Sequence, residues 1–232
     1  MKRNALPGKL ALALALALAL AQACGLAAAA DLQVTVTTAS GRPAPDVVVM
    51  VVPTVANPAA SPAPGSVTIL QRDNRFDPYV TAIPAGTSVR FVNQDRYDHH
   101  VRSLGTGPMG AVPPAKSFEL RLAGVQAGPA KASADVTFEA PGSVVLGCHI
   151  HGSMRGHLFI SGTPWVAVTD EFGRATVSGM PDGAAELRLW HPDQLTGQAT
   201  QALQLKGSAS ASATLSFNPQ RRPRPRPKGE YD

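Results

Sequence analysis

Apolar and polar residues alternate along most of this chain in short runs. These runs are rich in Val, Leu, Ile, Phe and Thr, and turns containing Gly, Pro, Asn or Asp separate most of them. Many short alternating runs bounded by turn residues predict an all-β fold of the sandwich or barrel type. The predicted strands are 32–37, 47–52, 67–70, 88–92, 118–122, 134–138, 143–146, 158–160, 166–168, 175–177, 187–190, 202–205 and 213–217.

Helical periodicity is weak throughout the same region. No stretch after residue 30 repeats its apolar positions over more than two helical turns. The segment 123–132 is the one ambiguous piece, and Gly124, Gly128 and Pro129 favour a loop there. We therefore expect a chain without long helices.

Residues 1–30 have the pattern of a secretion signal. Three basic residues lie in or beside the start of an uninterrupted Leu/Ala run at 10–21, and three alanines precede Asp31. The apolar run is short for a membrane span, which disfavours an N-terminal anchor. Lipidation at Cys24 is also disfavoured, because the usual bulky residue three positions upstream is missing. We expect a periplasmic protein whose mature chain has no integral membrane segment.

Removal of this segment changes the charge of the chain. The whole sequence has a formal net charge of +5, but three basic residues lie in the predicted signal and five in the Arg/Pro-rich tail 220–232. Residues 31–220 hold 13 basic and 14 acidic side chains, a net charge of −1. A basic face is not expected, so we predict no nucleic-acid binding. The tail has no apolar residue before Tyr231 and is expected to be disordered.

Cysteine usage is the first sign of specialised chemistry. The chain has two cysteines, and Cys24 lies in the predicted signal, so Cys148 is left without an intramolecular partner. A leftover cysteine in an oxidising compartment needs an explanation, and the two candidates are a buried small hydrophobe and a metal ligand.

The segment Val-Val-Leu-Gly-Cys-His-Ile-His-Gly-Ser-Met at 144–154 favours a metal ligand. An apolar strand delivers Cys148 at its end, and a tight loop brings His151 three residues later and Met154 three after that. Soft sulfur ligands combined with imidazole suit copper, and two His, one Cys and a weak axial Met form a blue-copper electron-transfer site. Zinc shares the Cys-x-x-His spacing but takes Cys or His as its fourth ligand. We expect one copper ion, Cu(I) or Cu(II), as the cofactor.

The second histidine of such a site must come from elsewhere in the fold. The pair His99-His100 follows the predicted strand 88–92 and supplies two candidates. Successive side chains of a regular strand point to opposite faces, so only one of the two can bind the metal.

The segment 76–154 resembles a cupredoxin of the plastocyanin, pseudoazurin and amicyanin group. The match comprises Phe-Asp-Pro at 76–78, Pro-Ala-Gly-Thr-Ser-Val-Arg-Phe at 84–91, Asn93, and a Pro-Gly turn at 141–142 before the cysteine strand. The Cys-x-x-His-x-x-Met spacing is that of amicyanin. The run Leu-Gly-Cys-x-Ile-His-x-x-Met is shared with cupredoxin-domain proteins described as methylamine-utilisation-like.

This resemblance implies a cupredoxin Greek-key sandwich. In cupredoxins the upstream motif usually reads His-Asn-Val, with the ligand first, so His99 aligns with the ligand and His100 with the asparagine. The implied copper ligands are His99, Cys148, His151 and Met154. His151, on the ligand loop, is the expected exit for electrons.

The flanks resemble two parts of one carboxypeptidase-regulatory-like, or transthyretin-like, β-sandwich. A Gly-Arg-Pro turn at 41–43 and an Asp-Glu-Phe-Gly-Arg turn at 170–174 carry this likeness. The first flank holds only two strands, which are marginally stable alone. We predict that the cupredoxin is inserted into the sandwich; the alternative is a tandem arrangement in which 32–52 supplies the cupredoxin's first strands. The predicted units are a signal (1–30), the first part of the sandwich (31–55), a linker (56–65), the cupredoxin (66–162), the second part of the sandwich (163–219) and the tail (220–232).

These features predict a non-enzymatic, monomeric protein that carries single electrons between redox partners. A copper chaperone or sensor is the alternative, although such sites favour exposed Met/His clusters and the chain has only five Met. A multicopper enzyme would need a second set of histidines, and the six His of the chain offer no suitable His-x-His pair apart from His149 and His151. The redox protein partner is not identified by the sequence.

Overall fold

The alternation of the sequence becomes an alternation of buried and less buried side chains along the strands. In β6 (Thr87–Asn93) every second residue is buried, starting with Thr87. In β13 (Arg174–Pro181) Ala175 and Val177 face the interior, while Arg174 and Thr176 face solvent. Successive side chains of a strand point to opposite faces, so each such strand has one apolar face to bury against a second layer.

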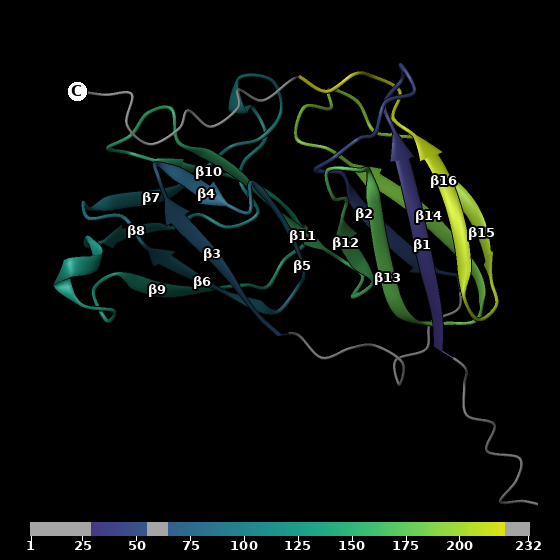
Figure 1. Cartoon of the computed structure of the whole chain (residues 1–232), viewed down its shortest axis with the longest axis horizontal. Helices are drawn as coiled ribbons and strands as arrows, with labels where there is room; N and C mark the ends of the chain where they lie inside the picture. The colour runs from purple at the N-terminus through teal and green to yellow at the C-terminus, as the bar shows by residue number, and fades with distance from the viewer. Residues whose placement is uncertain (1–28, 55–64, 221–232) are drawn as a thin grey trace, which may run out of the picture.

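The computed structural model describes residues 29–54 and 65–220 (Figure 1). The predicted signal up to residue 28, residues 55–64 (nearly all of the predicted linker 56–65) and the tail from 221 lie outside this part. The last two residues of the predicted signal, Ala29 and Ala30, are described and begin β1. Sixteen strands and two single 3-10 turns, η2 (Pro108–Gly110) and η3 (Val125–Ala127), make up the described regular structure, which confirms the predicted all-β fold. Neither turn is long and apolar enough to cross a membrane.

Two sheets enclose the core around Phe91, Leu146 and Leu158. Strands β3 and β6 pair in parallel, as do β5 and β11, whereas the other pairs are antiparallel. The order in the five-stranded sheet is β5 (Val80–Pro84), β11 (Arg155–Ser161), β10 (Gly142–Cys148), β7 (His99–Leu104) and β8 (Glu119–Leu122). The order in the four-stranded sheet is β4 (Arg75–Asp77), β3 (Ser66–Arg72), β6 and β9 (Ser133–Phe138).

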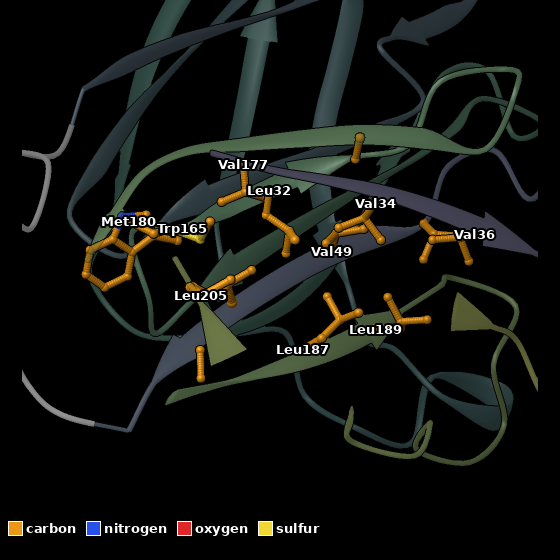
Figure 2. Packing of buried hydrophobic residues seen from close by; sticks show 14 of the residues in the cluster. Leu32, Val34, Val36, Val49, Trp165, Val177, Met180, Leu187, Leu189 and Leu205 are labelled. Atoms are coloured by element: carbon orange, nitrogen blue, oxygen red, sulfur yellow. The ribbon is translucent and has the colours of Figure 1, made fainter. Parts of the chain in front are cut away.

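The remaining two sheets enclose a separate core (Figure 2). Leu32, Val34 and Val36 of one sheet face Val49 and Leu187 of the other. The order in the first sheet is β13, β1 (Ala29–Thr37) and β16 (Ala209–Thr214), and in the second it is β12 (Val166–Val168), β2 (Val48–Pro53), β14 (Gly183–Trp190) and β15 (Gln201–Leu205).

The two N-terminal strands are interior strands of this second sandwich. β1 lies between β13 and β16, and β2 lies between β12 and β14. The chain therefore leaves one sandwich after β2, builds the other from β3 to β11, and returns at β12. The likeness of the outer sandwich to the transthyretin family remains a prediction.

The predicted strand pattern missed three strands, β4, β5 and β7. β7 reads His-His-Val-Arg-Ser-Leu, and its polar residues hide the alternation that buries His99 and Val101. The last predicted strand was displaced: the structure places β16 at Ala209–Thr214 and not at 213–217. Its first five residues alternate Ala and Ser, so Thr214 is its one β-branched residue and the strand signal is weak.

An aromatic contact joins the two sandwiches. Trp190 of β14 stacks on Phe159 of β11 with 4.9 Å between ring centroids, and its ring lies 6.4 Å from that of His157. The Tyr79 hydroxyl lies 3.1 Å from Nε2 of His157. The second sandwich thus packs beside β11, at the β5–β11 side of the five-stranded sheet. In Figure 1 the arrows of β3 and β6 run in the direction away from the second sandwich.

Deleting residues 31–55 tests this arrangement. The deletion removes nearly all of β1 and β2, so the strands on either side of each lose their hydrogen-bonding partners and their apolar cover. We expect residues 163–219 to become sensitive to limited proteolysis, while residues 66–162 stay protected and still bind copper. A resistant C-terminal half together with loss of copper binding would contradict this arrangement and favour the tandem alternative.

Candidate metal centre

Two antiparallel strands bring the cysteine beside the histidine pair. β10 ends at Cys148, which pairs with Val101 of β7, and β7 begins at His99. Side chains two residues apart on a strand share a face, so His99 and Val101 both point into the core. His99 is 1% exposed and Cys148 is 2% exposed. After Cys148 the chain curls, and its return is held by the Met154 N–H, which donates to the His151 carbonyl at 2.9 Å.

Three donor atoms of different residues converge at this end of the sandwich. Nδ1 of His99 lies 3.2 Å from Nδ1 of His151, and each of these nitrogens lies 3.6 Å from Sγ of Cys148. An ion bound about 2.0–2.1 Å from imidazole nitrogen and about 2.3 Å from thiolate sulfur separates such donors by about 3.3–3.8 Å. The three side chains therefore fit a single metal ion, and their chemistry is consistent with one copper ion.

The fourth predicted ligand lies beneath the loop. Met154 is 1% exposed and belongs to the same core cluster as Cys148. Its thioether is thus shielded from solvent, as a weak axial ligand needs to be. Coordination by Met154 remains a prediction.

The structure separates the two histidines of the pair. His99 points inward, whereas the side chain of His100 lies on the outer face of the sheet, where its Nε2 is 2.7 Å from Oε1 of Glu119. His149, which follows the cysteine, is exposed on that same side with its ring 5.5 Å from the His100 ring. The alternation of the strand decides this placement.

A carboxylate that the sequence did not single out holds the inner histidine. Nε2–H of His99 donates to Oδ2 of Asp95 at 2.8 Å. The proton on Nε2 leaves the Nδ1 lone pair free to bind a metal, so Asp95 sets both the tautomer and the orientation of the ring. The carboxylate is itself anchored, because it accepts the backbone N–H groups of Asp73 at 2.8 Å and Asn74 at 3.2 Å.

The loop that carries Asp95 is shaped by a buried asparagine. The Asn93 amide donates to the carbonyls of Tyr97, Leu122 and Ala123, and its oxygen accepts the Asp95 N–H at 2.8 Å. The sequence contains the motif Asn-x-Asp before the histidines, but Asp98, directly before His99, is nearer to it along the chain than Asp95. The structure shows Asp98 accepting a backbone N–H of the neighbouring loop, from Gly124, at 2.9 Å.

Gly124 lets that neighbouring loop approach closely. A Cβ at this position would lie 2.2 Å from the carbonyl oxygen of Arg96, so a side chain there is excluded. This close approach packs the turn η3 against the loop of Asp95 beside the site.

The electrostatics of the site favour a metal-binding state. Burial alone would raise the pKa of Asp95, but the hydrogen bonds from His99 and from the backbone of Asp73 and Asn74 outweigh it and hold that pKa below its usual value. Burial and the nearby His99 lower the pKa of His151, although Asp95 acts in the opposite direction. An ionised carboxylate and a neutral imidazole are the forms that a metal site requires.

Tyr97 packs against both imidazoles in edge-on or tilted contacts. Its ring is 5.5 Å from that of His99 and 5.3 Å from that of His151, and the residue is 43% exposed. Burial and the charges of Asp95 and Asp73 raise the pKa of Tyr97, so its hydroxyl remains protonated at neutral pH. Together with half-buried His151, this ring forms the boundary between the site and solvent.

Comparison with known proteins gives partial structural matches. Neither a protein-family model nor a curated protein sequence matches the chain. A Cu-containing nitrite reductase from Thermus scotoductus SA-01 is 30% identical and matches 47% of this chain but only 25% of its own, with a TM-score of 0.34. A mutant of amicyanin in its Cu(I) form is 17% identical, with 49% of this chain and 98% of its own covered and a TM-score of 0.33.

A purple cupredoxin from Nitrosopumilus maritimus is 21% identical, with 41% of this chain and 99% of its own covered and a TM-score of 0.33. Within this chain itself, two features agree with the resemblance found in the sequence. These features are the mixed two-sheet sandwich and the His–Cys–His cluster at its end. The domain that contains them is cupredoxin-like.

Substitution of each histidine of the pair tests the register of β7. We expect His99→Ala to abolish copper binding, because it removes a buried donor atom. His100→Ala should keep copper bound, because its side chain lies on the other face of the sheet. Copper stoichiometry measured by elemental analysis after dialysis distinguishes the two variants, and the opposite pattern would show that the register is shifted by one residue.

Substitution of Asp95 tests its role as a positioning residue. Asp95→Asn keeps a hydrogen-bond acceptor for His99 but removes a negative charge that favours Cu(II) over Cu(I). We expect the reduction potential to rise by tens of millivolts and the affinity for Cu(II) to fall by about 10- to 100-fold. Asp98→Asn is the matched control, and voltammetry of both variants should show a shift for Asp95→Asn alone. An equal shift in the two variants would contradict the assigned role.

Proposed function

We propose that this protein is a periplasmic type 1, or blue, copper protein that carries single electrons between redox partners. The observation that supports this most directly is the convergence of two imidazole nitrogens and one thiolate sulfur within 3.2–3.6 Å of one another in a cupredoxin-like domain. His99, Cys148 and His151 would hold the ion, and Met154 would be the weak axial ligand.

When bound, copper supplies a one-electron couple between Cu(I) and Cu(II). The fold holds the proposed ligand side chains in positions that need not change between the Cu(I) and Cu(II) states. Cys148 is held at the end of β10, His99 by the carboxylate of Asp95, and Met154 within the core. Ligands that are already placed keep the structural change on electron transfer small.

The ligand loop gives the site its contact with solvent. His99, Cys148 and Met154 are buried, whereas His151 is half-buried beside the exposed ring of Tyr97. Electrons would therefore enter and leave through His151 at the surface of this end of the sandwich. The partner would be a redox protein that covers this surface.

Burial also separates this proposal from the alternative of a copper chaperone or sensor. Transfer of the metal itself requires that an acceptor protein reach the sulfur ligands. Here Cys148 and Met154 are 2% and 1% exposed, so such transfer would need the ligand loop to open. Electron transfer needs no direct contact with sulfur, and a non-enzymatic carrier fits these ligands better.

The visible spectrum of the copper-loaded protein tests the proposed function. Thiolate bound to Cu(II) gives intense charge-transfer absorption, so we expect a strongly coloured protein with a reversible one-electron wave in voltammetry. Cys148→Ser should abolish the colour without unfolding the domain, as followed by circular dichroism. A colourless protein that binds zinc tightly in preference to copper would refute the proposal, and fast loss of copper to a Cu(I) chelator would favour the chaperone.

A further inference from the structure

A second set of metal-ligating side chains lies on the outer face of the five-stranded sheet. The antiparallel register pairs Cys148 with Val101, which places the next residue, His149, opposite His100. The His149 N–H donates to the His100 carbonyl at 2.8 Å, so the pairing extends past the end of β10. Directly opposite residues of antiparallel strands have Cβ atoms about 4.5–5.5 Å apart. Two histidines therefore lie side by side on the outer face of the sheet, His149 exposed and His100 largely covered.

The neighbouring strand β8 adds a carboxylate to this pair. Glu119 lies opposite Arg102, and thus diagonally across from His100, which lies opposite Arg121. Long side chains reach such diagonal neighbours. Oε1 of Glu119 is 2.7 Å from Nε2 of His100, whereas Nε of Arg102 is buried without a hydrogen-bond partner among the described residues. The carboxylate is thus already turned toward the imidazole.

The ring separation approaches that of a metal site, although the donor atoms of His100, His149 and Glu119 do not yet converge as those of the inner cluster do. Two imidazoles bound to one tetrahedral ion through bonds of about 2.0–2.1 Å have ring centroids about 5 Å apart. The centroids of His100 and His149 are 5.5 Å apart. A shared ion would move the nitrogen of His100 and the oxygen of Glu119 to about 3.3 Å from each other. Glu119 is 59% exposed and His149 is exposed, so both side chains are free to rotate. Their rotation would bring their donor atoms to the same ion as Nε2 of His100.

The geometry points to a second, surface metal site in which His100, His149 and Glu119 bind a divalent transition-metal ion such as Zn²⁺. Two imidazoles and one carboxylate are a ligand set that Zn²⁺ accepts, and with three protein ligands the fourth position is left to water or to a group of a partner. His100 and His149 are bonded in sequence to His99 and Cys148, so the site shares its two strands with the inner ligand cluster. An ion bound there adds positive charge beside that cluster.

Titration of the full-length, copper-loaded protein with Zn²⁺ tests this site. Copper occupies the inner cluster, and its colour reports that the cluster stays intact. We expect one further equivalent of Zn²⁺ to bind in isothermal titration calorimetry. Glu119→Gln and His149→Ala should each lower the Zn²⁺ affinity by at least about tenfold while the copper colour is retained. The matched control is Arg121→Gln, which changes a side chain opposite His100 that offers no ligand.

Two outcomes would overturn the site. One is the absence of a zinc equivalent beyond weak, non-saturating binding, which would leave His100 and Glu119 as a simple surface ion pair. The other is an unchanged Zn²⁺ affinity in both Glu119→Gln and His149→Ala. Failure of the inner copper site is recognised separately: the same titration of Cys148→Ser should retain one zinc equivalent that depends on Glu119 and His149.

Discussion

The register between β7 and β10 is the constraint on which the chemistry of this protein depends. Cys148 pairs with Val101, so the inward face of β7 presents His99 next to the thiol. Side chains alternate with a period of two, and a shift of one residue would exchange His99 for His100. The apolar residues of both strands oppose such a shift, since it would expose Val101 and bury Arg102. Packing of the core thereby selects the histidine that faces the cysteine.

The buried carboxylate of Asp95 links the strand that carries His99 to the neighbouring loops. Asp95 accepts hydrogen bonds from His99 and from the turn between β3 and β4, while its own N–H is held by Asn93. Buried polar groups are stable only when they are paired, and this network satisfies the carboxylate while it orients the imidazole. Three separate segments are therefore held around one ring, and rigidity at this point favours ligands that remain in place when the charge of a bound ion changes.

The second sandwich leaves this end of the molecule accessible. It contacts the β5–β11 side of the five-stranded sheet through Trp190, which stacks on Phe159, whereas the cluster of His99, Cys148 and His151 lies where β10 ends and β7 begins. The proposed electron carrier needs a short path from the metal to a partner, and the Trp190–Phe159 contact lies on strands other than the two that carry His99 and Cys148. The same arrangement leaves the outer face near His100 uncovered by Trp190.

Local sequence was enough to identify three of the candidate copper ligands, because Cys148, His151 and Met154 lie within seven residues and their chemistry suits copper. The all-β fold also followed from local alternation, except where polar residues, as in β7, or alternating Ala and Ser, as in β16, hide it. Tertiary structure alone decided that Asp95 and not Asp98 supports His99, and that His100 meets Glu119 and His149. These contacts join strands and loops distant in the chain, and their partners are chosen by sheet register and loop packing, which no single segment of sequence specifies.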